Sequence, residues 1–430
     1  MDKPFSRYIA KRTDLDRWPL QVDGVDNVDT VVVVPCLAER SRLPAMLSSL
    51  ARCSAGRLRH TLIICVVNNR DPDYAEPEDV RDNQALLSDF KESLEGCETD
   101  SIPRDAAKAL QLGFIDASSP GNELPEKDGV GLARKIGLDC GLSILADSPA
   151  TVRLLCSLDA DTTVAPNYLD AVHKAFDQDR AWAGVVNFEH PLPDESAHRE
   201  AIVDYEIFLR CHVHGLRVAG SPYAFHTVGS TMVCTPEAYA AVSGMNRRQA
   251  GEDFYFLQQL AKTGEMITIA TTTVYPSARA SHRVPFGTGR RVRQAIGNVT
   301  QSIGIYNPVV YTCVQRCFEL ANEECQEVQE EPVQKFLRGQ KFDAAWTRIC
   351  EGVTTDQQRE RQFHTWFDAF RTLKLIHFLR DNGLPNVAWD TAARAWRPEE
   401  RPQREAQEKF LMWLRDQDRD AAAGPPMGLR

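Results

Sequence analysis

The sequence lacks the cysteine pattern of a zinc ribbon or a disulfide scaffold. Its 430 residues contain 12 cysteines and no C-x-x-C pair, and most cysteines stand inside apolar runs, as Cys65 does in residues 61–67. Thiols in such runs are usually buried and reduced. The pattern therefore argues against the usual structural zinc site and for a reducing compartment.

Long apolar runs and a basic excess are missing as well. No segment reaches the ~18 apolar residues of a membrane span, and residues 1–7 lead into polar sequence rather than a signal peptide. We therefore expect a cytoplasmic protein with no transmembrane segment. The formal net charge is -10, whereas nucleic-acid binding needs basic side chains concentrated on one surface. We expect no nucleic-acid partner.

The composition that remains is typical of a globular protein, with 43% hydrophobic and 26% charged residues. A single core stops growing near ~250–300 residues, so 430 residues predict a large domain with an appendage. The chain beyond residue 308 is rich in Glu, Gln, Arg and Ala, holds five of the seven tryptophans and has helical spacing over 363–379. Two roles stay open for these helices, which are shaping the acceptor site and forming a homo-oligomer. We predict an N-terminal extension (1–27), an α/β domain (28–307), a helical region (308–420) and a disordered tail (421–430).

Short β-branched runs alternate with helical stretches through the predicted α/β domain. The predicted strands cover residues 30–34, 61–67, 112–115, 152–158, 182–188, 228–234 and 267–274. Strand–helix alternation predicts a doubly wound sheet, whose ligands bind outside the carboxyl ends of the strands. Pro35, Asn68 and Asp159 all stand at such ends and therefore predict one cleft. The acidic stretch 71–100 is interpreted as a solvated insertion.

An acidic triplet, Asp159-Ala160-Asp161, directly follows the strand at 152–158. Two aspartates there can supply hard oxygen ligands to Mn²⁺ or Mg²⁺, and a diphosphate would complete the coordination. Such a metal neutralises the charge that builds on a leaving nucleoside diphosphate. Taken alone, the triplet is equally compatible with an ordinary turn.

A second pair of carboxylates, Glu252-Asp253, opens a predicted helix. Asp253 is the candidate general base that accepts a proton from an acceptor hydroxyl. Glu252 is interpreted as orienting the acceptor or capping the helix. Acidic residues in a first helical turn also stabilise the helix dipole, which would explain one of the two without a catalytic role.

Basic side chains in two places are candidates for binding phosphate. A Pro- and Gly-containing loop carries His282, a candidate third metal ligand, with Arg283 and Arg290 as candidate phosphate ligands. A solvated basic loop is the alternative interpretation. Arg134 and Lys135, at the start of a predicted helix, are the other candidates.

In their order and spacing, these motifs resemble those of family 2 glycosyltransferases with a GT-A fold. The resemblance rests on Val33-Val34-Pro35 with Glu39, on Leu-Ala-Arg-Lys-Ile-Gly at 132–137, on 158–161 and on 251–253. It implies a GT-A mixed sheet flanked by helices over residues 28 to about 290. It further implies that Pro35, Glu39 and Asn68 line the nucleotide pocket. By the same resemblance, Asp159 contacts the ribose or the metal, Asp161 binds the metal, and Asp253 is the base of an inverting reaction.

The sequence departs from that family in two places. Asn68-Asn69-Arg70 stands where the family often carries acidic residues that read uracil, which leaves the base of the donor open. The Gln-x-x-Arg-Trp motif of processive synthases is replaced by residues 290–294, Arg-Arg-Val-Arg-Gln. We therefore expect a non-processive enzyme. Because some soluble retaining GT-A enzymes also use Asp-Ala-Asp and a late histidine, the stereochemical outcome stays open.

Our prediction is a metal-dependent glycosyltransferase that moves one sugar from a nucleotide diphosphate sugar to a hydroxyl acceptor. A sugar nucleotidyltransferase is one alternative, but it would carry a glycine-rich basic loop after the first strand, and residues 36–40 contain no glycine. The other alternative is a non-catalytic GT-A-like domain that acts through partner binding. Such a domain should have lost its carboxylates, whereas Asp159, Asp161 and Asp253 are present.

Overall fold

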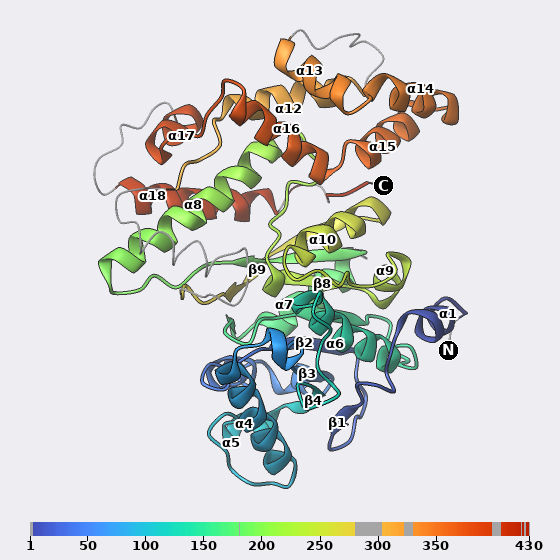
Figure 1. The fold of residues 1–430 in the computed structure, drawn as a ribbon, viewed down its shortest axis with the longest axis vertical. Coiled ribbons are helices and arrows are strands. Elements are labelled where there is room, and N and C mark those ends of the chain that lie inside the picture. The colour runs from blue at the N-terminus through green and yellow to red at the C-terminus, as the bar shows by residue number, and fades with distance from the viewer. Residues whose placement is uncertain are drawn as a thin grey trace. The chain divides into compact units, whose positions relative to one another are not determined.

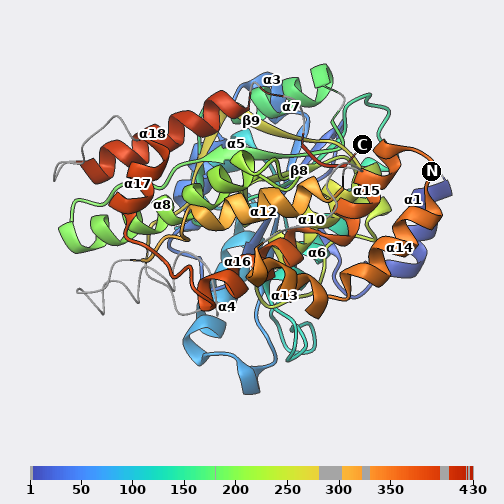
Figure 2. The ribbon, with the colours of Figure 1, turned by 90° about the horizontal axis from the view of Figure 1, so that it is seen from above.

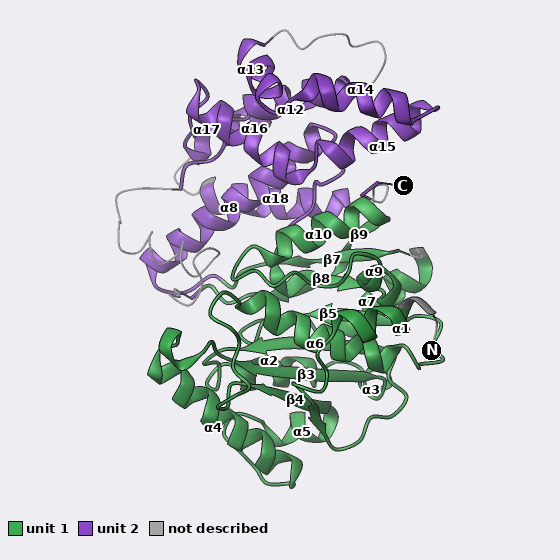
Figure 3. Ribbon diagram, turned by 45° about the vertical axis from the view of Figure 1, so that its right-hand side comes forward, with its two compact units in different colours: residues 1–191, 227–278, 282–287 green, residues 192–226, 279–281, 288–430 purple. Residues whose placement is uncertain are grey.

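The chain packs into two compact units. A computed structural model describes residues 3–179, 181–279, 303–321, 330–397, 406–422, 424 and 427–429. Unit 1 consists of the described residues up to Pro191 together with Thr227–Ala278, and unit 2 of Leu192–His226 together with the helices beyond residue 303 (Figure 3). The chain therefore leaves unit 1, contributes one segment to unit 2 and returns.

Unit 1 is built on a mixed sheet with nine described strands. They are β1 (Leu20–Val22), β2 (Thr30–Cys36), β3 (Thr61–Asn68), β4 (Gln111–Ala117), β5 (Leu154–Ser157), β6 (Thr163–Val164), β7 (Ala183–Phe188), β8 (Met232–Cys234) and β9 (Met266–Tyr275). Their order across the sheet is β1-β4-β3-β2-β5-β8-β7-β9-β6. The four strands β4, β3, β2 and β5 are parallel, and β8 runs antiparallel between β5 and β7 (Figure 1).

Burial explains why these segments are strands. Every residue of β2 and β3 is buried, as expected for β-branched runs in a sheet that is covered on both faces. The predicted α/β mixed sheet flanked by helices is confirmed. The predicted strand at 228–234 is shorter than expected, because Gly229–Thr231 forms a 3₁₀ turn before β8.

Helices and short turns connect these strands. They are α1 (Lys3–Arg12), α2 (Leu43–Leu50), α3 (Ala55–Leu58), α4 (Pro77–Leu94), α5 (Arg104–Ala109), α6 (Val130–Leu145), α7 (Tyr168–Asp179), α9 (Pro236–Ala241) and α10 (Glu252–Thr263). The interpretation of residues 71–100 as a solvated insertion is wrong. The stretch contains α4, whose Asn83, Leu86, Leu87 and Phe90 are buried, because an acidic outer face coexists with an apolar inner one.

Two glycines let α6 lie unusually close to the sheet. A Cβ atom at Gly137 would stand 2.3 Å from Cγ1 of Val33, and one at Gly141 would stand 2.9 Å from Cγ1 of Val31. A larger residue at either position would push the helix off β2. The close packing fixes the height at which Arg134, on the preceding turn of α6, meets the sheet.

Unit 2 is helical, which confirms the prediction of a helical C-terminal region. Its elements are α8 (Ser196–Val218), α12 (Val309–Glu319), α13 (Glu331–Gly339), α14 (Phe342–Gly352), α15 (Asp356–Trp366), α16 (Ala369–Asp381), α17 (Trp389–Trp396) and α18 (Ala406–Ala421). The helical spacing over 363–379 is divided between α15 and α16, because the Asp368 side chain accepts a hydrogen bond from Arg371 N and caps α16. No helix among the described residues is long and apolar enough to cross a membrane.

A buried ionic cluster joins α8 to α18, which lie side by side (Figures 1 and 2). The fully buried Arg210 bonds to Glu206 (Nε–Oε1 2.8 Å) and to Asp418, and Arg415 binds Glu206 through two nitrogens at 2.7 and 2.9 Å. These contacts, with the apolar cluster around Ile207 and Phe410, explain why Leu192–His226 belongs to the helical unit 2, although the α/β domain was predicted to include it. The predicted limits of independently folding domains stay a prediction.

Candidate active site

Four predicted site residues, Arg134, Asp159, Glu252 and Asp253, come together at the carboxyl edge of the parallel strands. Arg134, which is 3% exposed, lies at the centre. Its Nε donates to Glu252 Oε1 (3.1 Å), its Nη1 to Ser157 Oγ (2.6 Å) and its Nη2 to Asp159 Oδ1. The guanidinium therefore ties the end of β5 to the start of α10.

Close backbone packing holds this cluster in place. A Cβ atom at Gly229 would stand 2.2 Å from Arg134 Nη2, so the turn before β8 lies directly against the guanidinium. Gly131 N donates to Arg248 O (3.1 Å), and a Cβ there would lie 2.5 Å from that oxygen. Gly251, with φ +70°, then turns the chain into α10. The glycines thus anchor the loop that presents Glu252 and Asp253.

Burial and charge set Asp253 apart from its neighbours. Burial, reinforced by the nearby Glu252 carboxylate, raises the pKa of Asp253 to about 7, although Phe254 N and Arg134 oppose the shift. Burial tends to lower the pKa of Arg134, but Asp159 and Glu252 outweigh it and keep the guanidinium charged. A carboxyl group that titrates near neutral pH can both accept and donate a proton under physiological conditions.

A network of amides closes the other end of the site, after β2 and β3. The buried Asn83 donates to Asn68 O (3.0 Å) and to Asn69 Oδ1 (3.0 Å), and its Oδ1 accepts from Ala38 N (2.9 Å). Among the described residues, the buried Oδ1 of Asn68 has no hydrogen-bond partner. An unsatisfied acceptor at a strand end is a ready partner for a ligand donor group.

Strand β2 and the residues after it bring two more predicted residues to this end. Pro35 is buried within β2, in register with Val66 of β3. Glu39 follows β2, is 7% exposed, and its carbonyl oxygen accepts from Arg42 N and Leu43 N at the start of α2. Asn83, which holds this end of the site together, was missed because it lies in the acidic stretch. Its spacing to Leu86 and Phe90 on one helix face was the available signal.

Other predicted site residues are not brought to the cluster. Lys135 lies on a different face of α6, where Nζ donates to Asp139 Oδ2 (2.7 Å) and Tyr8 Oη (2.9 Å). His282, Arg283 and Arg290 lie outside the described residues.

The described donor set suits a hard divalent cation in its chemistry. Asp159 and Asp161 flank a turn closed by Thr162 N and Asp159 O (3.0 Å), and the Asp159 side chain is 35% exposed. Its Oδ1 is bound to Arg134, which leaves Oδ2 for a ligand. Carboxylate oxygens are what Mg²⁺ and Mn²⁺ prefer. Within the described ranges, no group of three or more His, Cys, Asp or Glu side chains is placed to hold a metal ion.

Comparisons with known proteins add little. No protein-family model matches the sequence, and no curated protein matches it either. Among solved structures, the chain is similar to residues 1–349 of S. aureus TarS, at 10% identity and a TM-score of 0.37, covering 87% of this chain and 93% of that one. The same fragment in complex with UDP-GlcNAc gives 11% identity with the same coverage and TM-score. At this score the likeness carries no argument, so the fold and the site rest on the geometry described above.

Proposed function

We propose that this protein is a non-processive, family 2-like glycosyltransferase with a GT-A fold. It would transfer one sugar from a nucleotide diphosphate sugar to a hydroxyl acceptor. The observation that carries the proposal is the cluster of Asp159, Glu252 and Asp253 around Arg134 at the carboxyl edge of a parallel sheet, where burial raises the pKa of Asp253 to about 7. Ligands in such sheets bind at this edge, and a base with a pKa near neutrality is suited to activating a hydroxyl.

In the proposed reaction, Asp253 accepts the acceptor's hydroxyl proton as that oxygen attacks the anomeric carbon. The bond from the anomeric carbon to the diphosphate oxygen breaks at the same time, through a transition state with oxocarbenium character. Glu252, fixed by Arg134, orients the acceptor. The nucleoside diphosphate leaves with the bonding electron pair.

The donor would lie across the ends of β2, β3 and β5. Pro35, Glu39 and Asn68 would line its nucleoside pocket, and Asn68 Oδ1 offers an acceptor for a donor group of the base or ribose. Asp159, Asp161 and His282 would hold Mn²⁺ or Mg²⁺, which, when bound, supplies Lewis-acid neutralisation of the leaving diphosphate.

The predicted basic residues take different parts in this proposal. Arg283 and Arg290 would bind the phosphates. Arg134 would act by positioning, because all three of its guanidinium nitrogens already bond within the protein. Lys135 would contribute only indirectly, through α6.

The test measures the binding of a panel of nucleoside diphosphates, with and without Mn²⁺, as a shift in the melting temperature of the protein. One nucleotide should stabilise the wild type in a metal-dependent manner, by about 2.7 kcal/mol at a concentration 100 times its Kd. Asp161→Ala should lose the metal-dependent part. Asp177→Ala, an exposed position on α7 in the same unit, is the matched control. If no nucleotide binds with any metal, the proposal fails and partner binding becomes the leading function.

A second assay separates the proposed reaction from nucleotidyl transfer. With the nucleotide identified, the corresponding nucleotide sugar should be consumed in the presence of hydroxyl acceptors and should release nucleoside diphosphate. Release of pyrophosphate from a nucleoside triphosphate and a sugar phosphate would instead identify a sugar nucleotidyltransferase.

A further inference from the structure

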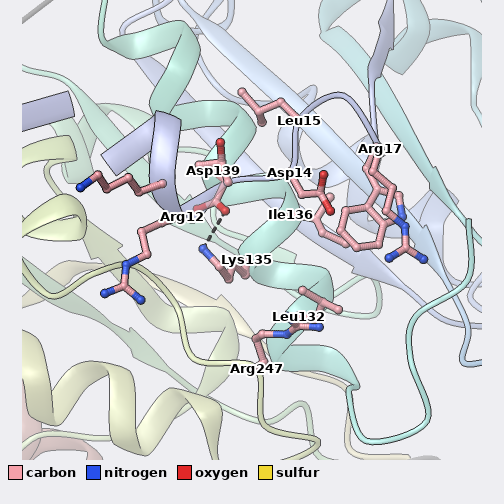
Figure 4. Close-up of a pocket in the computed structure, with 12 residues that line it drawn as sticks. Arg12, Asp14, Leu15, Arg17, Leu132, Lys135, Ile136, Asp139 and Arg247 are labelled. Carbon is pink, nitrogen blue, oxygen red and sulfur yellow. Dashed lines mark hydrogen bonds and ion pairs between the residues drawn. The ribbon is translucent and has the colours of Figure 1, made fainter. Parts of the chain in front are cut away.

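Unit 1 contains a pocket beside α6 (Figure 4). It has a volume of about 250 Å³. Its walls come from the end of α1, the segment that follows it as far as Trp18, one face of α6, and Arg247. None of the residues that form the Arg134 cluster lines it.

Helical spacing separates this pocket from the candidate active site. Leu132, Lys135, Ile136 and Asp139 line the pocket and follow the i, i+3, i+4, i+7 spacing of a single helix face. Gly137 and Gly141 lie on the other face, against β2. A ligand in the pocket would therefore have α6 between itself and the sheet.

The pocket carries positive charge that the described residues do not neutralise. Five cations line it. Two of them have acidic partners, since Lys135 bonds to Asp139 (2.7 Å) and Arg247 to Asp128. Within the described part of the chain, no carboxylate forms an ion pair with the other three, which are Lys11, Arg12 and Arg17.

Stabilisation of the α1 helix dipole explains only part of this positive charge. Lys11 and Arg12 stand in the last turn of α1, where cations stabilise the helix dipole. Arg17 lies outside any helix. Its guanidinium carbon stands 4.3 Å from the centre of the Trp18 ring, and its Nη2 donates to Glu123 O (3.1 Å). The ring and the carbonyl orient the guanidinium of this exposed side chain, and its remaining N–H groups can donate to an anion.

The inner surface of the pocket is apolar. Leu132 and Ile136 are 3% and 6% exposed and line it together with Leu15. Arg12 and Arg17 stand on opposite sides of this surface in Figure 4. The volume equals that of about eight water molecules in the liquid, which is room for a ring and one charged group.

We propose that this pocket binds a small organic anion that joins one phosphate or carboxylate group to an apolar body, about the size of an aryl phosphate monoester. The charged group binds the guanidinium of Arg17, at one side of the pocket, and the apolar part covers Leu132 and Ile136. Asp14, which also lines the pocket, weakens the binding of an anion. The site is independent of the proposed sugar transfer.

Calorimetric titration of the full chain with phenyl phosphate tests this site. Phenyl phosphate should bind one to one and more tightly than inorganic phosphate, because only the ester covers the apolar surface. Arg17→Ala should weaken binding by about tenfold, Arg12→Ala should weaken it less because Arg12 lies across the pocket, and Asp14→Asn should strengthen it a few-fold.

Arg52→Ala is the matched control, because Arg52 is an exposed arginine of the same unit, and it should leave the affinity unchanged. All the substituted positions are on the surface or partly exposed, so circular dichroism should show wild-type folding. The proposal is overturned if phenyl phosphate does not bind, if it binds no better than phosphate, or if the Arg17 variant binds as the wild type does.

Discussion

Each unit contains a buried arginine that bonds to two carboxylates, yet the two clusters differ in what surrounds them. In unit 2, Arg210 lies between Glu206 and Asp418, whose side chains are 0% and 5% exposed. In unit 1, Arg134 lies between Glu252 and Asp159, and the Asp159 side chain is 35% exposed. One cluster is closed to solvent and the other opens onto it.

The carboxyl groups respond in opposite directions. Burial tends to raise the pKa of Asp418, but His226, Arg210 and Arg217 outweigh it and hold that pKa below its usual range. Asp253 lies near the carboxylates of Glu252 and Asp159 and near a single cation, Arg134. Its pKa rises to about 7. A surplus of cations makes a structural cluster, whereas a surplus of carboxylates leaves one group able to exchange a proton near neutral pH.

Removing the surplus carboxylate gives the largest expected effect. Asp253→Asn keeps the side-chain shape and removes the base, so we expect kcat to fall about 10²–10⁴-fold, measured as initial rates with the donor that nucleotide binding identifies. Melting temperature provides the control for folding. An undiminished rate would show that another group accepts the proton.

Breaking the closed cluster should act on stability instead. Arg210→Met removes the cation that lies between Glu206 and Asp418, and removing one partner of a buried pair costs about 3–5 kcal/mol. Because Glu206 keeps Arg415 and Asp418 keeps His226, we expect about 3 kcal/mol in urea denaturation. A loss below about 1 kcal/mol would mean that the cluster is no more stabilising than a surface pair.

The raised pKa of Asp253 also predicts a dependence of stability on pH. The folded state holds this proton up to a pH of about 7, while the unfolded state releases it near 3.8. Stability from this group is therefore lost as pH rises from about 4 to 7. Asp253→Asn abolishes the loss, so its free energy of unfolding relative to wild type should be higher at pH 8 than at pH 5, by about 1–3 kcal/mol. Equal differences at the two pH values would place the pKa of Asp253 near its ordinary range.

An exposed pair in unit 2 supplies the smallest effect. Arg394 bonds to Asp390 across one turn of α17 (2.7 Å), with side chains that are 54% and 35% exposed. Solvent screens such a pair, so Arg394→Met should change the free energy of unfolding by about 0–1 kcal/mol. The same substitution type at Arg210 and Arg394 thus isolates the contribution of burial. A loss at Arg394 as large as that at Arg210 would remove this distinction.

The central strands and several site residues were predictable because each depends on local sequence. Buried β-branched runs define β2 and β3, and a polar residue at a strand end, such as Asn68, follows from the topology of a parallel sheet. The sequence predicted Arg134 as a phosphate ligand and gave no sign that it positions other side chains. Its partners Asp159 and Glu252 are 25 and 118 residues away in sequence, and periodicity carries no information about such contacts.

Unit 2 shows the same limit on a larger scale. The helical character of the chain beyond residue 308 was readable from its composition. That α8 packs with those helices was not, because its charged residues Glu206 and Arg210 look like an ordinary solvated i, i+4 pair. Only the arrival of Arg415 and Asp418 from α18 shows that they are buried.

That arrangement has a consequence for how the protein is made. Glu206 and Arg415 are separated by 209 residues, and ribosomes add roughly 5–20 residues per second, so α8 is synthesised about 10–40 s before α18. During that interval β8 and β9 emerge and unit 1 can complete its sheet. The face of α8 that packs against α18 in the folded protein stays exposed to solvent until α18 is made. Synthesis thus imposes an order of assembly, in which α18, which follows α8 by about 200 residues, completes a unit that α8 began.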